Sequence, residues 1–208
     1  MPRLSQEKSD ARRAEIIDAC EALYQSESYH DITMSQVASG VTFGRANIYN
    51  YFQCKDEILL ALLQREHDKW TARLDELADD AENLDDERVA EGLAQSLAER
   101  KQMLKLLAMN LYDMEQNSRL EKLVEFKRSY ARAVEALQRV ITRAKPSWGE
   151  ERRMRFLCSF LPFLQGIYSY AFHSEKQLDA MREAGVTPYD LDIRTATRDL
   201  VLKLLQED

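Results

Sequence analysis

Turn-forming residues are scarce in this sequence, and their scarcity limits the available folds more than any other feature. The 208 residues include only six glycines and four prolines. A protein of many short strands needs such residues at its turns, whereas a protein of long helices needs few of them. The sequence therefore predicts an all-α fold.

The overall composition argues against several other classes of protein. With 45% apolar and 31% charged residues, the chain resembles an ordinary soluble globular protein. Its longest apolar run, Ile58 to Leu63, has six residues, and the N-terminus carries no signal-peptide core. A membrane-spanning helix needs roughly 20 apolar residues. Three widely spaced cysteines indicate neither a disulfide framework nor a zinc site. We expect a cytoplasmic protein without a cofactor or a bound metal.

The net charge of −7 argues at first against a nucleic-acid partner. The excess of acids, however, lies in one segment. Residues 75–91 hold nine acids and one base, a charge of −8, so the other residues sum to +1. The acidity is therefore local and does not exclude DNA binding elsewhere in the chain. We expect this acidic segment to form a solvated helix end and loop.

The first part of the sequence has the pattern of a helix-turn-helix motif. Residues 9–26 carry apolar side chains at the three- and four-residue spacing of an amphipathic helix. Thr33 and Gln36 then have the spacing of a capping box, which predicts the start of a second helix. Gly40 interrupts that helix and Gly44 allows a third to begin, so two helices of about seven residues flank a tight turn. In such motifs the last helix enters the DNA major groove.

The predicted third helix has one apolar and one polar face. Ile48 and Phe52 fall on the apolar face and are expected in the core. The opposite face groups side chains that form hydrogen bonds or stack: Arg45, Asn47, Tyr49, Asn50 and Tyr51. A merely solvated surface has no need of such a cluster, so we interpret it as a DNA-binding face. The alternative is a helical adaptor without a DNA role.

Two stretches of this region match the pattern of a known family. Thr33 to Ala38, followed by Arg45 to Leu59, resembles the N-terminal DNA-binding domain of the TetR family of transcriptional regulators. The resemblance covers about residues 11–62, and its most specific part runs from Ile48 to Lys55.

The resemblance implies an all-helical homodimer with two domains in each chain. Residues 1–55 would form the helix-turn-helix DNA-binding domain, and residues 56–208 the effector-binding and dimerisation domain. It further implies a repressor that binds a palindromic DNA operator and is released by a small-molecule effector.

Carried over by position, the resemblance assigns phosphate contacts to Tyr49 and Lys55 and places the helix N-terminus at Thr33 beside a phosphate. On chemical grounds Arg45 suits guanine and Asn47 suits adenine. The expected DNA contacts include three basic residues of the N-terminal arm. The full set is Thr33, Ser35, Arg45, Ala46, Asn47, Tyr49, Asn50, Tyr51, Lys55, Lys8, Arg12 and Arg13.

The sequence departs from the family pattern at three positions. Thr42 replaces a glycine that many members have in the turn, which predicts a differently shaped or strained turn. Gln53 stands where a lysine or proline is common and removes one charge. Cys54 stands where a better capping residue is usual.

The other two thirds of the sequence predict long helices. A helix from near Cys54 toward the acidic segment is expected to connect the two domains as a rod. Residues 89–115 predict one or two helices and residues 118–145 a long one. Residues 150–173 predict an apolar helix that Pro162 should kink.

A last amphipathic helix is expected over residues 189–205. Together with residues 150–173 it resembles the family's dimer interface, a four-helix bundle with two helices from each subunit. The residues assigned to this interface are Phe156, Leu164, Ile167, Tyr168, Ile193, Leu200 and Leu204.

An effector pocket is expected among the helices of residues 85–172. Its candidate walls are mostly apolar, with two hydroxyls to orient a ligand. They are Trp70, Met103, Leu107, Tyr112, Phe126, Tyr130, Phe160 and Phe163. These residues indicate a mostly apolar ligand, although the same set is also typical of plain core.

Two alternatives come from other functional classes. Helical bundles can hold di-iron sites through Glu-x-x-His pairs, but Glu27 and His30 form the only such pair. No nucleotide-binding or hydrolase motif occurs, so we expect no enzyme. The second alternative is a redox-sensing regulator, because Cys54 lies at a helix N-terminus beside Lys55, conditions that lower a thiol pKa.

Overall fold

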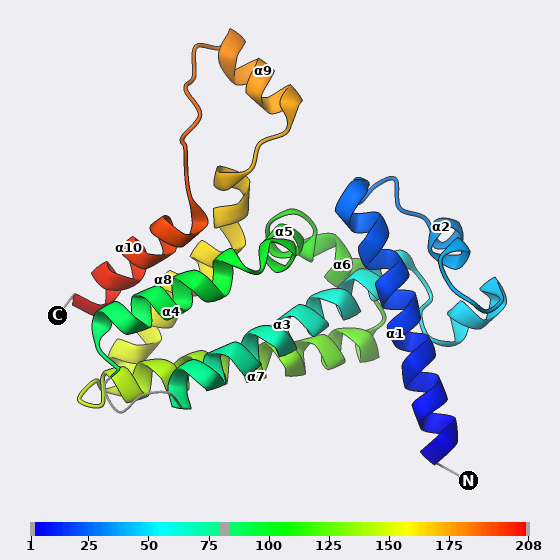
Figure 1. The fold of residues 1–208 in the computed structure, drawn as a ribbon, viewed down its shortest axis with the longest axis horizontal. Coiled ribbons are helices and arrows are strands. Elements are labelled where there is room, and N and C mark those ends of the chain that lie inside the picture. Colours follow the sequence, from blue (N-terminus) through cyan, green and yellow to red (C-terminus); the bar gives the residue numbers. More distant parts are fainter. Residues whose placement is uncertain (1–2, 80–83, 207–208) are drawn as a thin grey trace. The chain divides into compact units, whose positions relative to one another are not determined.

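The computed structural model describes residues 3–79 and 84–206 (Figure 1). All regular secondary structure in these ranges is helical, which confirms the predicted all-α fold. The helices, of which η1 is a 3-10 helix, are α1 (Arg3–Ser26), α2 (Met34–Ser39), η1 (Arg45–Asn50), α3 (Lys55–Asp79), α4 (Asp86–Ala98), α5 (Lys101–Met109), α6 (Leu111–Asn117), α7 (Leu120–Ala144), α8 (Glu150–Ala171), α9 (Glu175–Glu183) and α10 (Ile193–Gln206).

The chain forms two compact units. The first comprises Met1–Arg65 and Asn110–Arg128, and the second comprises Glu66–Met109 and Ser129–Asp208. The first unit therefore holds α1, α2, η1, the start of α3, all of α6 and the start of α7. This division differs from a boundary after residue 55, because a later segment of the chain folds into the first unit.

The second helix begins where the sequence predicts it. The Thr33 hydroxyl accepts a hydrogen bond from the Gln36 N–H (3.3 Å), and the Gln36 side chain accepts one from the Thr33 N–H (2.8 Å). At its other end, α2 stops at Gly40, which lies against α1. A Cβ atom added to Gly40 would lie 2.9 Å from the Cβ of Ala19, closer than real side chains approach. Glycine is therefore required here for space.

The third element is shorter and tighter than expected. Residues Arg45–Asn50 form a 3-10 helix, and the Tyr51 N–H donates to the Ile48 carbonyl at 2.9 Å. A helix of about seven residues is predicted here and one of six is found, closed by hydrogen bonds between residues three positions apart, which define a 3-10 helix. Its apolar face is as predicted, since Ile48 and Phe52 are fully buried.

The turn between α2 and η1 is not strained, contrary to the expectation at Thr42. Among the described residues, only Gly185 has a positive φ angle. The Thr42 N–H donates to the Glu15 carboxylate of α1, which pairs a backbone group that the loop itself leaves unpaired. An ordinary backbone conformation thus accommodates a residue other than glycine.

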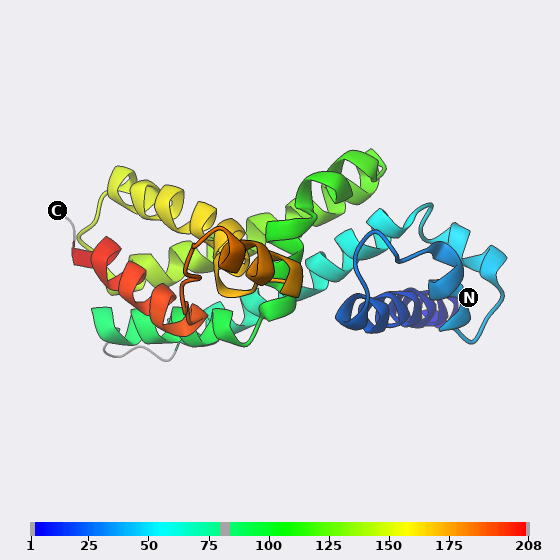
Figure 2. The same ribbon diagram turned by 90° about the horizontal axis from the view of Figure 1, so that it is seen from above.

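In the second unit, α10 packs along α4, and α8 packs against α5 and α10 (Figure 2). The later turns of α3 and α7 also belong to this unit and run in the same direction. Three ion pairs, each between residues 64 positions apart, mark this parallel register: Asp68 with Arg132, Asp75 with Arg139 and Asp79 with Arg143.

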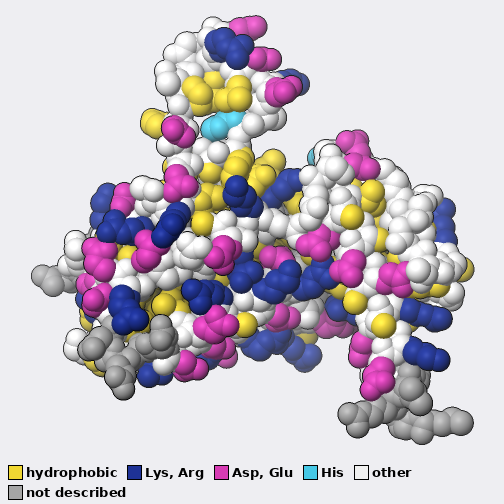
Figure 3. All heavy atoms as spheres, in the orientation of Figure 1, with side chains coloured by type: hydrophobic (Ala, Val, Ile, Leu, Met, Phe, Trp, Pro, Cys, Tyr) yellow, Lys and Arg dark blue, Asp and Glu magenta, His cyan; other side chains and the backbone are white. Residues whose placement is uncertain are grey.

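The acidic segment is paired as well as solvated, which corrects the expectation from composition. Five of its acids face bases of the second unit: Asp75 with Arg139, Asp79 with Arg143, Asp86 with Lys145, Glu87 with Arg198 and Glu91 with Arg194. Residues 80–83 of the segment lie outside the described residues. On the face shown in Figure 3, acidic and basic side chains accordingly lie interspersed over this unit.

The remaining helices follow the predictions with four differences. α1 begins at Arg3 rather than at residue 9. Three helices, α4 to α6, occupy the region where one or two were expected. α10 begins at Ile193 rather than at residue 189, because the Asp192 carboxylate accepts the Thr195 N–H (2.7 Å) and so caps the helix. α9 is absent from the prediction. It starts at a capping box of Ser174 and Gln177, but all of its residues except Met181 are exposed, so no apolar stripe marks it.

The contact between Gly40 and Ala19 leads to a test of stability. Gly40→Ala should lower the free energy of unfolding by about 1–3 kcal/mol, because the added methyl group overpacks a rigid helix contact. Gly44→Ala is the matched control, since nothing lies within 4 Å of its added Cβ. Urea unfolding of the full-length variants measures both changes. Equal losses in the two variants would contradict the close approach of α1 to Gly40.

Candidate nucleic-acid interface

The exposed face of η1 brings several of the predicted DNA-contacting residues together. Five of them are exposed: Arg45, Ala46, Asn47, Tyr49 and Asn50. Buried Ile48 fixes the rotation of η1, so that these side chains face solvent. The Arg45 guanidinium donates from Nη2 to the Tyr49 hydroxyl at 3.5 Å, which places the two groups side by side. Tyr51, the C-cap of η1, is half-buried.

The start of α2 contributes two of the predicted contacts. Thr33 and Ser35 are both exposed. The Thr33 hydroxyl is already engaged with the Gln36 side chain (2.7 Å), and Ser35 is the second residue of α2. Gln36 is itself anchored, since its Nε2 donates to the Glu27 carboxylate at 2.8 Å.

The three basic residues of the N-terminal arm lie on α1. Lys8 and Arg12 are exposed, and the Arg12 guanidinium lies 5.4 Å from the centroid of the Phe43 ring in the turn. Arg13 is half-buried over the Phe52 ring, 5.6 Å from its centroid. The arm therefore presents two exposed cations, and a third that is partly covered by protein.

Lys55, the first residue of α3, is held by protein carbonyl groups. Its Nζ donates to the carbonyl of Tyr29 (2.6 Å) and to that of His30 (3.4 Å), and it lies 4.5 Å from the centroid of the Tyr29 ring. A phosphate contact by Lys55 would therefore share this ammonium group with the protein or replace one of its bonds.

An ion pair next to η1, between a buried carboxylate and a half-buried guanidinium, was not predicted. The Glu57 side chain is 0% exposed, and its carboxylate accepts bonds from Nε (2.6 Å) and Nη2 (2.8 Å) of Arg119. The backbone N–H groups of Gln53 (2.7 Å) and Arg119 (3.2 Å) also donate to it. Burial acts to raise the pKa of Glu57, but these donors outweigh it and hold the pKa below its ordinary value. The carboxylate is therefore ionised at neutral pH.

Two further buried hydrogen bonds join separate helices of the first unit. The Tyr24 hydroxyl of α1 donates to Oδ1 of Asn110, directly before α6, at 2.8 Å. The Tyr29 hydroxyl donates to the Asp56 carboxylate of α3. Burial, together with this carboxylate, raises the pKa of Tyr29, so the phenol remains a donor at neutral pH. Each bond fixes the elements that it joins, because a buried polar group left unpaired is costly.

Cys54 does not have the surroundings of a reactive thiol. Burial raises its pKa, opposite to the effect expected from the neighbouring Lys55. The Lys55 ammonium is turned to the carbonyl groups of Tyr29 and His30, and the Cys54 thiol donates to the Asn117 carbonyl at 3.5 Å. A raised pKa lowers the thiolate fraction at neutral pH, so the redox-sensing alternative loses its physical basis.

The residues predicted to contact a ligand are divided between the units. Six belong to the second unit, of which the first four are buried and the last two half-buried: Trp70, Met103, Leu107, Phe160, Tyr130 and Phe163. Trp70 is further fixed by a hydrogen bond from Nε1 to the Ser96 hydroxyl (3.1 Å). Phe126, which is buried, and Tyr112, which is 75% exposed, belong to the first unit.

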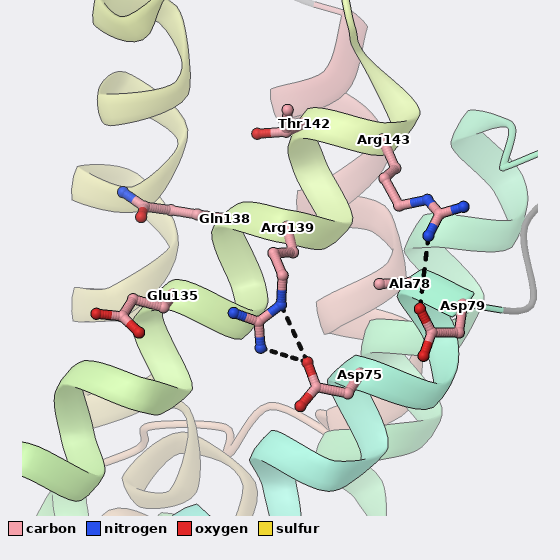
Figure 4. Close-up of a pocket in the computed structure, with 8 residues that line it drawn as sticks. All are labelled: Asp75, Ala78, Asp79, Glu135, Gln138, Arg139, Thr142 and Arg143. Carbon is pink, nitrogen blue, oxygen red and sulfur yellow. Dashed lines mark hydrogen bonds and ion pairs between the residues drawn. The ribbon is translucent and has the colours of Figure 1, made fainter.

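A surface groove in the second unit is polar (Figure 4). It has a volume of about 830 Å³ between α3 and α7, and it is lined by Asp75, Ala78, Asp79, Glu135, Gln138, Arg139, Thr142 and Arg143. Figure 4 shows two arginines of α7 reaching the aspartates of α3, as the ion pairs require. The two arginines are already paired with these aspartates, and none of the predicted ligand contacts lines the groove, so the groove is not the predicted effector pocket.

The residues assigned to the dimer interface lie mainly inside the subunit. Five are buried and the last two half-buried: Phe156, Leu164, Ile167, Ile193, Leu204, Tyr168 and Leu200. The exposed face of α8 carries Met154, Cys158 and Tyr170 instead. A helix that is apolar on most sides has more than one candidate stripe, and periodicity alone does not decide which stripe faces its own core.

Neither a membrane-spanning helix nor a metal-binding cluster of side chains is found in the described parts of the chain. No helix there is long and apolar enough to cross a membrane. No group of three or more His, Cys, Asp or Glu side chains in the described ranges is placed to hold a metal ion.

Comparison with protein families covers nearly the whole chain. Residues 16–62 match the family of bacterial regulatory proteins described as the tetR family, and residues 64–206 match the tetracyclin repressor-like C-terminal domain. One curated relative is the uncharacterized HTH-type transcriptional regulator YfiR of Bacillus subtilis (strain 168), which is 27% identical over 78 residues. That match covers 38% of this chain and 38% of the relative's length.

Solved structures of regulators share this fold over most of their length. The fatty acid degradation regulator FadR of Bacillus halodurans is 14% identical with a TM-score of 0.62, over 93% of this chain and 94% of that one. A TetR/AcrR-family regulator of Thermobifida fusca is 16% identical with a TM-score of 0.63, over 94% and 97%. FadR of Bacillus subtilis, solved with stearoyl-CoA, is 19% identical with a TM-score of 0.61, over 92% and 96%. At these identities the likeness shows the fold.

The raised pKa of Cys54 is testable by alkylation. In a full-length Cys20→Ala, Cys158→Ala variant, Cys54 should reach half of its maximal rate with iodoacetamide at a pH above that of free cysteine, because burial disfavours the thiolate. The reaction at neutral pH should accordingly be slower than that of free cysteine. A half-maximal pH below that of free cysteine would reveal an activated thiol and reinstate the redox alternative.

Proposed function

Because the chain belongs to the TetR family of bacterial transcriptional regulators, we propose that it is a repressor that binds a palindromic operator as a homodimer and is released by a small, mostly apolar ligand. The observation that carries the proposal is the exposed polar face of η1, held on a capped helix-turn-helix motif. The family is one of regulators, and no enzymatic activity is proposed.

In the proposed complex, η1 enters the major groove and its exposed face contacts the bases. Arg45 would donate two hydrogen bonds to guanine and Asn47 would pair with adenine, each worth about 1–3 kcal/mol of discrimination. Tyr49 lies beside Arg45 and would contact a backbone phosphate. In a dimer, the two η1 helices would reach half-sites about 34 Å apart, one turn of the duplex.

The charge of the DNA-binding region predicts a modest electrostatic contribution. Residues 1–55 contain six bases and seven acids. Binding without sequence specificity depends on cations that replace the counterions of DNA. We therefore expect weak binding to random duplex and a shallow dependence on salt, so that base contacts carry much of the operator preference.

The proposed dimer forms through the exposed side of α8 together with α10. Met154, Cys158 and Tyr170 are exposed along α8. Two helices from each copy would form a four-helix bundle with twofold symmetry, in which one patch meets its own counterpart. Phe156 and Leu164, which are buried, would then support this face from inside the subunit.

The proposed ligand occupies the apolar interior of the second unit. Trp70, Met103 and Phe160 provide apolar surface there, and Tyr130 provides a hydroxyl. Because the first three are packed as core, a ligand must displace side chains or helices to enter, and this coupling would shift the conformational equilibrium. A ligand with a long apolar chain, of the general kind found in the B. subtilis FadR structure, agrees with these walls.

Substitutions on η1 test the DNA-binding proposal. Arg45→Ala and Asn47→Ala should each reduce the preference for operator over random duplex by about 1–3 kcal/mol. Tyr49→Phe should weaken binding to both duplexes alike, because a phosphate contact carries no sequence information. Competitive gel shifts with the duplex that the full-length protein selects from a randomised pool measure these effects.

The control for these variants is Arg182→Ala, which removes an exposed arginine from α9. It should bind both duplexes like the unaltered protein. A wild-type protein that selects no sequence from the pool would contradict the proposal itself.

A charge on the exposed face of α8 tests the dimer. Met154→Asp should raise the dimer dissociation constant by about a hundredfold or more, because two desolvated carboxylates would face each other across the twofold axis. Light scattering after size-exclusion chromatography reports the mass. Val124→Asp is the matched control, since Val124 is similarly exposed (39% against 47% for Met154) but lies on α7 of the first unit. Dissociation of both variants, or of neither, would contradict this interface.

A further inference from the structure

The Arg119 guanidinium bonds to two elements of the first unit. Arg119 directly precedes α7, and its Nε and Nη2 occupy both carboxylate oxygens of Glu57. The same Nη2 lies 3.5 Å from the Tyr51 carbonyl, at the C-cap of η1. One side chain thus contacts both the end of η1 and the first turn of α3.

Glu57 extends this network to Gln53, two residues after Tyr51. Its second carboxylate oxygen accepts the backbone N–H of Gln53 at 2.7 Å. The connection from η1 to α3 is therefore held at two backbone groups, the Tyr51 carbonyl and the Gln53 N–H. Between them, the buried Phe52 side chain anchors the same connection in the core.

The orientation of η1 depends on this connection. η1 has six residues and a 3-10 geometry, so its own hydrogen bonds are few and weak. The apolar contacts of Ile48 and Phe52 hold η1 against the core, but apolar burial has little directionality. Hydrogen bonds that involve ionised groups are directional and among the strongest available to a protein.

We propose that Arg119 is a positioning residue for DNA recognition, which acts through Glu57 and the Tyr51 carbonyl to hold η1 at the angle that the operator requires. This positioning role rests on the proposed DNA-binding function. It adds to the residues that determine DNA recognition one that lies outside the helix-turn-helix sequence. Arg119 does not touch DNA in this proposal. α7 begins directly after Arg119 and runs from Leu120 to Ala144, and its later turns belong to the second unit.

A double variant separates positioning from stability. Arg119→Met alone would leave the Glu57 charge buried without its partner, which destabilises a protein strongly. Replacing both partners with apolar residues of similar size is often neutral for stability. Glu57→Leu combined with Arg119→Met should therefore keep the thermal midpoint of the full-length protein, yet lose the bonds to the Tyr51 carbonyl and the Gln53 N–H.

The measurement compares the affinity for two duplexes, together with the thermal midpoint by circular dichroism. The probes are the duplex that the wild-type protein selects from a randomised pool and a random duplex of equal length. The double variant should bind the selected duplex about tenfold or more weakly and the random duplex unchanged, since lost orientation affects base contacts first. Arg132→Met is the matched control, because Arg132 lies on α7, which Arg119 directly precedes, but forms an exposed pair with Asp68. It should change neither affinity.

The affinities of these variants decide whether Arg119 positions η1 or only stabilises the fold. Wild-type affinity for the selected duplex in a folded double variant would overturn the proposal and leave the pair a merely structural one. If the double variant loses its thermal transition, Arg119→Lys decides: it keeps the charge but not the two-pronged geometry. A folded Arg119→Lys variant should bind the selected duplex severalfold more weakly, and wild-type affinity would again overturn the proposal. A wild-type protein without any sequence preference would instead contradict the proposed function.

Discussion

Two helices of six residues, α2 and η1, carry the main proposed DNA contacts, and neither is long enough to be stable in water by itself. Their conformation therefore depends on what surrounds them. α2 is closed at its start by the Thr33 and Gln36 capping box and packs against α1 so closely that Gly40 admits no side chain. η1 has no side-chain cap at its start, and it relies on buried Ile48 and on the network that follows its C-cap. The exposed polar face is thus a consequence of contacts on the opposite face.

The net charge of the protein can be interpreted only with the positions of the charged residues. The acidic segment accounts for the net negative charge, yet five of its acids face bases on other parts of the second unit. Each exposed pair contributes only about 0–1 kcal/mol, so these pairs do little for overall stability. Two of these pairs, Asp75 with Arg139 and Asp79 with Arg143, join α3 to α7 with the same offset of 64 positions and so favour one parallel register of these two helices. The buried pair of Glu57 and Arg119 is different, since it has a full set of donors and no exposure on the acid side.

Features that depend on neighbours in the sequence were predictable, and features that depend on distant partners were not. The capping box at Thr33 was located to the residue, because both of its members lie within one turn. A similar signal at Ser174 was available for α9, but without an apolar stripe it did not distinguish a helix from a loop. Arg119 and Glu57 lie 62 positions apart, so nothing in the local pattern joins them. The mostly apolar α8 shows the opposite difficulty, because its sequence offers several apolar stripes that could face the core. Only the packing of α8 against α5 and α10 decides which stripe lies inside the subunit.

The division of the chain into units bears directly on how a ligand signal would travel. A boundary in sequence order assigns α6 and the start of α7 to the ligand-binding part, whereas by contact they belong with the helix-turn-helix motif. Buried polar bonds explain this membership, since Asn110 before α6 pairs with Tyr24 and Arg119 after α6 pairs with Glu57. Both α3 and α7 then leave the first unit as unbroken helices. A displacement of either helix in the second unit would therefore act on elements that already belong to the DNA-binding unit.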